Sequence, residues 1–303
     1  MRARGFQVER VCRVLRDYGI QIAARTYRAF KKRAPSARSV ADAELTAVMK
    51  ALRETPDAKG RLPRERFYGR RKMHALMVKK GHVCGEEKIG RLMRLAGMAG
   101  LVRGRRITTT RKTAPSAGDL LNRQFAADAP NQVWVADLTY VRTLSGWVYV
   151  GFITDAYARK IVGCDGACSM TQKLVSDTLA IAIDGRAHAG HPVGAGLVHH
   201  ADHGSQYTSV KYGEQLMLAG ITGSFGAVGD SYDNALAETV NGLYKAECAD
   251  QDGPFATLAD VMDATLDWVR WYNSERLHEY LNYSTPDEAE AAYYSTQQPL
   301  ETQ

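Results

Sequence analysis

Apolar positions in the first sixty residues recur at the spacing of helices rather than strands. One stripe consists of Phe6, Val8, Val11, Val14 and Leu15 and ends near Gly19. A second helix is predicted over residues 39–55, with Ser39 or Asp42 as its N-cap and Pro56 beyond its end. We therefore expect residues 1–60 to form a helical N-terminal region.

Residues 61–102 carry two shorter apolar stripes with a glycine between them. The stripes are formed by Met73, Leu76 and Met77, and by Ile89, Leu92, Met93 and Leu95. Gly81 separates them, and Lys and Arg residues occupy the outer faces. Two short helices joined by a tight turn predict a helix-turn-helix DNA-binding domain, although helical hairpins of other function share the pattern. Residues 103–130, which begin RGRRITTTRKT and lack apolar periodicity, are typical of a basic linker that lies along phosphates.

The period of the pattern changes at Asn131. Strands rich in β-branched and aromatic residues are predicted over 132–142, 147–157, 160–168 and 195–202. Helices are predicted over 171–187, 209–220, 231–249 and 257–277, with a short apolar segment at 221–225. Three consecutive strands followed by alternating helices and strands predict an α/β fold of the ribonuclease-H-like type, a mixed sheet flanked by helices.

Charge divides the chain near residue 115. Residues 1–115 contain thirty Lys and Arg against nine Asp and Glu, a net charge of +21. Residues 116–303 contain ten against twenty-four, a net charge of −14. Such a basic half favours nucleic acid as its partner. The sequence has no signal-peptide pattern and no run of eighteen apolar residues, so we expect a cytoplasmic protein that does not interact with membranes.

Three carboxylates stand out in the acidic half. Asp137 interrupts an apolar strand, Asp202 ends the fourth strand, and Glu238 falls on a predicted helix. At about 100° per residue, Asn241 and Lys245 share the helix face of Glu238. Scattered surface carboxylates are common, but an aspartate within an apolar strand requires a reason. We predict that the three carboxylates meet at one edge of the sheet.

These residues resemble the catalytic triad of retroviral-integrase-type DDE recombinases. The likeness is carried by the segments WVADLTY, HHADHGSQYTS and DNALAETVNGLYKAE, with thirty-five residues between Asp202 and Glu238 and with Lys245 seven positions after the glutamate. The segment WYNSERLHEYLNYSTPDEAE resembles the tail of bacterial insertion-sequence transposases, specifically their second-reading-frame (OrfB) products. Within it, HEYLNYSTP departs from the pattern usual in relatives, outside the triad. The resemblance implies an integrase-type catalytic core with a C-terminal helical tail over residues 131–295.

The resemblance also implies an activity, DNA transposition by metal-dependent phosphoryl transfer. The three carboxylates would be both catalytic residues and metal ligands, holding two Mg²⁺ (or Mn²⁺) ions when DNA is bound. Hydrolysis would expose a 3′-hydroxyl at an element's end, and that hydroxyl would attack another phosphodiester. Oxygen ligands suit these hard cations. The neighbouring His199, His200 and His203 raise the alternative of a zinc site, which the opposite faces of adjacent strand positions disfavour.

Two other functions stay open at this stage. One is a ribonuclease-H-like nuclease without strand transfer, and the other is a non-catalytic DNA-binding regulator. The transposase interpretation implies as partners the terminal inverted repeats of the element, target DNA, and a second copy of the chain on DNA. It further implies an upstream-frame (OrfA) protein, as a fusion or a partner, and association with a bacterial nucleoid.

DNA contacts are predicted on the second helix of the helix-turn-helix, in the linker, and beside Glu238. These positions are Lys88, Arg91, Arg94, Arg103, Arg105, Arg106, Asn241 and Lys245. Arginines on the helix can read guanine in the major groove. Trp134 and Trp147, on the first two predicted strands, are expected in the core, with stacking on bases as the alternative.

Overall fold

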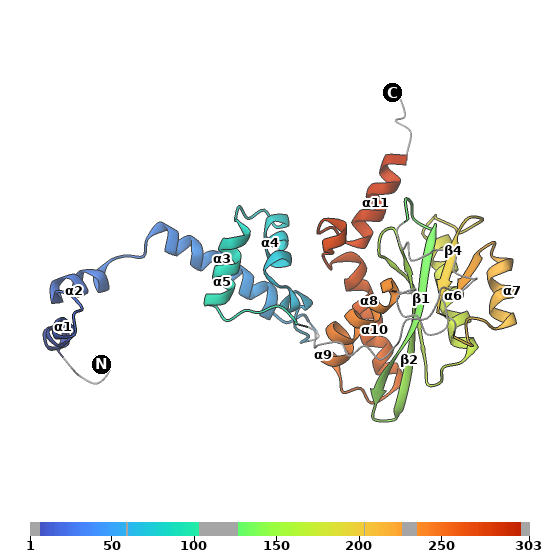
Figure 1. Cartoon of the computed structure of the whole chain (residues 1–303), viewed down its shortest axis with the longest axis horizontal. Helices are drawn as coiled ribbons and strands as arrows, with labels where there is room; N and C mark the ends of the chain where they lie inside the picture. Colours follow the sequence, from blue (N-terminus) through green and yellow to red (C-terminus); the bar gives the residue numbers. More distant parts are fainter. Residues whose placement is uncertain (1–6, 59, 103–126, 203, 226–234, 298–303) are drawn as a thin grey trace, which may run out of the picture.

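Three parts follow one another along the chain in the computed structural model: a helical arm, a three-helix unit and a larger domain built on a sheet (Figure 1). The structure describes residues 7–58, 60–102, 127–202, 204–225 and 235–297. The arm consists of α1 (Val8–Asp17) and α2 (Ala24–Lys32), which extend away from the rest of the chain (Figure 1). The apolar pattern predicts α1 but not α2, because α2 buries none of its residues.

The three-helix unit contains the predicted helix-turn-helix and one more helix. Its members are α3 (Ala37–Glu54), α4 (Arg70–Lys79) and α5 (Glu86–Leu95). Met49 of α3 is fully buried in one cluster with Met73 and Ile89 of the other two helices. Helix α3 thus shares a core with α4 and α5, although the expected domain boundary at residue 60 lies between them; that boundary stays a prediction. Gly81 follows α4 with φ +85°, a left-handed conformation that glycine adopts without strain.

The N-cap of α3 also differs from the expectation. Ser36, not Ser39 or Asp42, caps the helix, and its hydroxyl accepts a hydrogen bond from the Ser39 N–H. Asp42 instead lies one turn inside α3, where its carboxylate meets α5.

The larger domain is built on a five-stranded sheet in the order β3-β2-β1-β4-β5. The strands are β1 (Val133–Thr143), β2 (Gly146–Asp155), β3 (Ile161–Ala167), β4 (Val198–Ala201) and β5 (Thr222–Phe225). The first three form an antiparallel meander, and β4 and β5 run parallel to β1. This mixed sheet confirms the predicted ribonuclease-H-like fold, and its strands lie where the apolar pattern places them.

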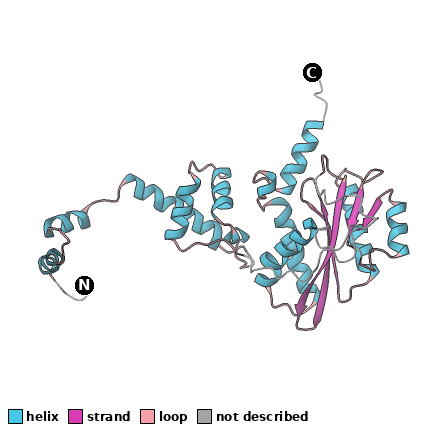
Figure 2. Ribbon diagram, viewed as in Figure 1, coloured by secondary structure: helices cyan, strands magenta, loops and turns pink. Residues whose placement is uncertain are grey.

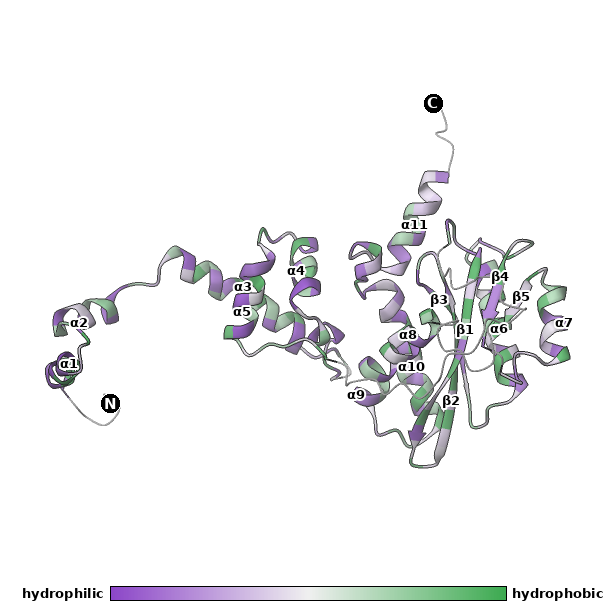
Figure 3. Ribbon diagram, viewed as in Figure 1, coloured by the Kyte–Doolittle hydropathy of each residue, from purple (hydrophilic) through white to green (hydrophobic). Residues whose placement is uncertain are grey.

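Helices cover both faces of the sheet (Figure 2). They are α6 (Gln172–His188), α7 (Val210–Leu218), α8 (Ala235–Tyr244), α9 (Asp250–Asp252), α10 (Leu258–Ser274) and α11 (Pro286–Gln297). On one face Trp134 and Ile153 pack with residues of α6 and α7, and on the other Phe152 packs against Tyr244 and Trp268 of α8 and α10. Apolar residues accordingly concentrate in β1 and β2 (Figure 3).

Two features of the C-terminal part were not predicted by the apolar pattern. The predicted helix 231–249 is described from Ala235, and after Tyr244 it continues as a π-helical turn, Lys245–Ala249. A further helix, α11, follows α10. The apolar pattern misses α11 because the helix buries only Pro286 and Glu290. Among the described residues, no helix is long and apolar enough to cross a membrane.

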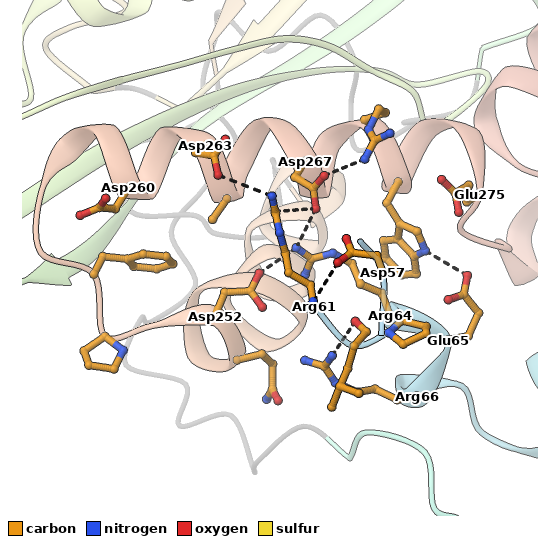
Figure 4. Close-up of a pocket in the computed structure, with 18 of the residues that line it drawn as sticks. Asp57, Arg61, Arg64, Glu65, Arg66, Asp252, Asp260, Asp263, Asp267 and Glu275 are labelled. Carbon is orange, nitrogen blue, oxygen red and sulfur yellow. Dashed lines mark hydrogen bonds and ion pairs between the residues drawn. The ribbon is translucent and has the colours of Figure 1, made fainter. Parts of the chain in front are cut away.

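A basic segment of the N-terminal half is docked on the acidic face of α10 (Figure 4). Arg61 pairs with Asp267 at 3.1 Å, and Arg64 pairs with Asp252 at 2.7 Å. Trp271 of α10 donates a hydrogen bond from Nε1 to Glu65, 3.2 Å away. Part of the charge split seen in the sequence is therefore neutralised within the molecule.

Candidate active site

Asp137 and Asp202 lie at the end of the same parallel strand pair. The β1–β4 ladder runs from Val133↔Val198 to Ala136↔Ala201, so each aspartate is the residue that directly follows the last pair. Asp137 remains within β1 and is partly buried, whereas Asp202 follows β4 and is exposed. Parallel strands in register bring equivalent positions to one edge of a sheet. The two carboxylates therefore share that edge, as the sequence predicts.

A tight turn fixes the carboxylate of Asp202. The Gly204 N–H donates to Asp202 Oδ1 at 3.1 Å. A Cβ at position 204 would lie only 3.0 Å from that same oxygen. The turn thus depends on glycine for the close approach between its backbone and the carboxylate.

Helix α8 brings the third carboxylate to this edge. Ala237, Val240 and Tyr244 form its buried face, and Glu238 lies in its first turn. Asn241, one turn later, donates from Nδ2 to Asp137 Oδ2 at 2.9 Å and to the Leu138 carbonyl at 3.4 Å. Asn241 is only 9% exposed. Its amide therefore binds the Asp137 carboxylate and the β1 backbone, and a DNA contact by Asn241 stays a prediction.

The electrostatics of Asp137 show that Asp202 and Glu238 lie close enough to affect its carboxylate. Burial raises the pKa of Asp137 to about 7, and the negative charges of Asp202 and Glu238 add to the rise. Hydrogen bonds from the Leu138 N–H and from Asn241 lower the pKa and offset part of this effect. Such mutual repulsion is what a bound divalent cation relieves.

The site also contains a buried tyrosine that sequence reasoning did not assign. Tyr207, in the turn after Asp202, is 3% exposed and packs edge to face on Tyr212 with ring centroids 5.6 Å apart. Burial raises its pKa well above the usual value, and the charges of Asp137 and Asp202 add to this. Tyr207 therefore stays a neutral phenol beside the two aspartates. Only its sequence proximity to Asp202 could have indicated this.

The three histidines near Asp202 are the alternative metal ligands to the carboxylates. His199 and His200 are both fully buried and face different partners, with His199 Nε2 2.7 Å from Tyr212 Oη and His200 Nδ1 2.9 Å from Ser224 Oγ. His203 lies outside the described residues. Within the part of the chain that the structure describes, no three Asp, Glu, His or Cys side chains are close enough together to hold a metal ion.

The predicted DNA-contact residues fall into three groups. Lys88 and Arg91 pair with Asp42 at 3.2 and 2.7 Å and so join α5 to α3, whereas Arg94 is exposed. Lys245 lies over the ring of Tyr140, with Nζ 4.4 Å from its centroid. The linker positions Arg103, Arg105 and Arg106, like most of the predicted linker, lie outside the described residues. Base contact by Arg94 stays a prediction, and Lys88 and Arg91 would have to exchange Asp42 for DNA.

Comparison with known families defines the class to which this fold and site belong. Family models described as integrase core domain match residues 127–231 and 219–286, and one described as HTH-like domain matches residues 42–106. The catalytic core of HTLV-2 integrase in complex with magnesium aligns with a TM-score of 0.41 at 16% identity, covering 54% of this chain and 98% of that one. The match to the HTH-like domain includes α3, in agreement with the shared core.

Individual relatives share a higher sequence identity with this chain than the integrase core does. The chain is 42% identical to a putative transposase for insertion sequence element IS986/IS6110 of Mycobacterium tuberculosis, over 91% of this chain and 98% of the relative. It is 45% identical to the transposase for insertion sequence element IS629 of Shigella sonnei, over 76% of each. The protein belongs to the family of bacterial insertion-sequence transposases with an integrase core.

Proposed function

We propose that this chain cuts DNA at the ends of its insertion sequence and joins the resulting 3′ ends to target DNA, with Asp137, Asp202 and Glu238 as the catalytic residues. The observation that carries this proposal is the meeting of Asp137 and Asp202 at one edge of the sheet, with Asn241 linking α8 to Asp137. Family membership supports the same reaction class. Two aspartates at one end of a parallel strand pair, with Glu238 on the helix beside them, suit phosphoryl transfer better than DNA binding alone.

The donor set fits magnesium or manganese. All three side chains offer carboxylate oxygens, the ligands that these hard cations prefer, and the raised pKa of Asp137 reflects negative charge that a cation would neutralise. When bound, two such ions supply charge stabilisation to the attacking and leaving oxygens of an in-line displacement. Asp137 and Asp202 would hold them from the strand ends, and Glu238 would complete the site from α8.

The remaining residues of the site have positioning roles. Asn241 donates a hydrogen bond to one oxygen of Asp137 and so fixes the orientation of the carboxylate. The Gly204 N–H does the same for Asp202. Lys245 lies on the helical segment that continues from α8 and would contact a phosphate beside the reacting bond.

The partners that we propose are the terminal repeats of the element, target DNA and a second copy of the chain on the two ends. The HTH-like match and the net charge of +21 in residues 1–115 support DNA binding by the N-terminal half. An upstream-frame protein, as a fusion or partner, remains part of the proposal and awaits a test by co-expression.

The test is strand transfer with two DNA ends in the presence of Mg²⁺. Asp137→Asn, Asp202→Asn and Glu238→Gln should each lower cleavage by more than about 100-fold, because loss even of outer-shell metal partners typically costs 10–100-fold. DNA affinity should change little, because each substitution keeps its side chain's shape. Asp165→Asn is the matched control, since Asp165 is a carboxylate of the same sheet on β3, away from the β1–β4 edge.

The assay also separates the alternatives. A nuclease would cleave the ends but join none, and a regulator would shift DNA in a gel without metal-dependent cleavage. Near-normal cleavage by any one of the three variants would remove that residue from the triad.

A further inference from the structure

The β1–β2 hairpin carries a cluster of two aromatic and two cationic side chains. Tyr140 and Trp147 meet edge to face with ring centroids 5.3 Å apart. Nζ of Lys245 lies 4.4 Å from the centroid of Tyr140, and the guanidinium carbon of Arg142 lies 5.6 Å from that of Trp147. We call Tyr140, Arg142, Trp147 and Lys245 the aromatic platform.

The aromatic side chains of this platform are open to solvent. Trp147 is 46% exposed and Tyr140 is 54% exposed. Trp134, by contrast, is fully buried as expected for a strand tryptophan. The prediction that Trp147 lies in the core is therefore wrong: it is the second residue of β2, next to the turn of the hairpin, and its side chain is exposed. Large exposed aromatic surface next to cations is characteristic of surfaces that bind a partner.

The hairpin does not depend on these rings for its fold. On its opposite face Val141 and Val148 are 6% and 2% exposed and belong to the main hydrophobic cluster. At its tip the Leu144 N–H donates to the Phe255 carbonyl at 2.9 Å. The hairpin is therefore anchored from behind and at the tip, which leaves the platform as a rigid outer surface.

The platform adjoins the catalytic residues on both of its elements. Tyr140 lies three residues beyond Asp137 on β1, about 10 Å along the strand, and points to the opposite face because side chains alternate along a strand. Lys245 lies seven residues after Glu238 on the segment that continues α8. Lys245 reaches from the end of α8 to the ring of Tyr140 and so connects the platform with the helix that carries Glu238. A DNA strand that leaves the carboxylates along β1 would reach the platform within a few nucleotides.

We propose that the aromatic platform binds an unpaired nucleotide of the DNA substrate next to the reacting phosphodiester. Its base would stack on Trp147 or Tyr140, and its phosphates would lie between Arg142 and Lys245. In a duplex the flat faces of the bases are stacked on one another and only their edges are accessible in the grooves. Exposed rings flanked by cations therefore suit a base that has left the stack, and they suit any of the four bases. This inference rests on the proposed function in one respect: the proposed function specifies which DNA the platform binds.

The four tryptophans allow a direct binding measurement in the full-length protein. Trp134 and Trp268 are fully buried and Trp271 is 5% exposed, so a change of emission at a solvent-accessible tryptophan reports on Trp147. The probes are a blunt duplex, the same duplex with a short single-stranded 3′ tail, and that tail with abasic sites, all titrated in EDTA so that no cleavage occurs. We expect quenching by the tailed duplex, and little by the blunt or abasic forms.

Substitutions of Trp147 then test whether its aromatic ring causes the binding of the single-stranded tail. Trp147→Leu should weaken binding of the tailed duplex by about 5- to 100-fold, the range for loss of one base–aromatic stack, and that of the blunt duplex by less than about twofold. Trp147→Phe keeps a ring and should retain most of the affinity. The matched control is Tyr280→Leu, because Tyr280 is 63% exposed and lies against Arg159 at 3.8 Å, a similar pair with no catalytic carboxylate among its contacts.

Equal losses on blunt and tailed duplexes would overturn the proposal, since cations or the hairpin fold would then explain them. Tight binding of the abasic tail by the wild-type chain would overturn it without any variant. Failure of the proposed function is a separate outcome. A wild-type chain that binds the tail through Trp147 but neither cuts nor joins DNA ends would support the platform and contradict the proposed transposase mechanism.

Discussion

At the scale of single residues, two of the three buried imidazoles among the described residues, those of His199 and His278, are held neutral by the fold. Burial lowers the pKa of His199 to about 3, with His200 adding to the effect, and lowers that of His278 to about 2, with Arg276 adding. An unfolded histidine titrates near 6.5. The stability that these groups contribute is therefore complete above about pH 6.5 and is lost as the pH falls below it, because the unfolded chain takes up protons that the folded chain refuses.

His199→Gln should test this at one position. The difference in unfolding free energy between wild type and variant should shift against the wild type by about 1.4 kcal/mol per pH unit between pH 6 and pH 4. Urea unfolding at several pH values measures it. A difference that does not vary with pH would show that His199 is not held neutral.

Asp137 changes the stability with pH in the opposite direction. Its raised pKa means that the folded, metal-free chain holds a proton up to about pH 7 that the unfolded chain has already lost, so Asp137 costs stability as the pH rises from about 4 to 7. A cation must displace this proton in order to bind. We predict that Mg²⁺ raises the melting temperature clearly at pH 8 and much less at pH 6. In Asp137→Asn the shift should be small at both pH values; a full shift in the variant would exclude Asp137 as a ligand.

At the scale of elements, the π-helical turn after α8 is held by two arginines. Arg276 reaches both carboxylate oxygens of Glu247, with Nη2–Oε1 at 2.8 Å and Nε–Oε2 at 2.9 Å, and both residues are buried. Arg64, from the N-terminal half, donates to the Glu247 carbonyl at 2.6 Å. π-helical turns often occur near functional sites, and this one links the helix that carries Glu238 to a distant segment of the chain.

Breaking this buried pair should be costly, and replacing it should not. Glu247→Gln should destabilise the fold by about 3–5 kcal/mol, because Arg276 is left buried without its counter-charge. The double change Glu247→Leu with Arg276→Met should cost clearly less than the sum of the two single changes. Chemical denaturation of the wild type, Glu247→Leu, Arg276→Met and the double variant gives the four free energies of a double-mutant cycle. Additive losses would mean that the two side chains do not act as a pair.

At the scale of the whole molecule, the basic and acidic halves are parts of one packed structure. Tyr68 is 2% exposed, accepts the Leu277 N–H at 2.9 Å, and belongs to the same hydrophobic cluster as Trp271. Arg61 adds an ion pair to Asp267 of α10 and Arg64 one to Asp252 of α9 across the same contact (Figure 4). The helix-turn-helix unit is therefore attached to the core by more than the intervening sequence.

Cutting the chain should not separate the halves. With a protease site inserted between residues 115 and 116, the two fragments should elute together in gel filtration at physiological salt. Arg64→Ala should weaken their association by about 10- to 100-fold, because Asp252 loses a mostly buried partner. Arg25→Ala, on the arm at α2, is the control with unchanged association. Fragments that separate in the wild type would show that the contact is not stable.

The amino-acid sequence by itself determined the first four strands along the chain, the two helices of the helix-turn-helix and the placement of Asp137 and Asp202 at one edge of the sheet. These follow from local periodicity and from polar residues in apolar surroundings, which leave a signal within a few neighbouring positions. Tertiary structure alone decided that α3 joins the helix-turn-helix, that Asn241 holds Asp137, and that Trp147 is exposed while Trp134 is buried. Each of these depends on which distant segment lies opposite a side chain. A strand tryptophan looks the same in sequence whether or not a helix covers it.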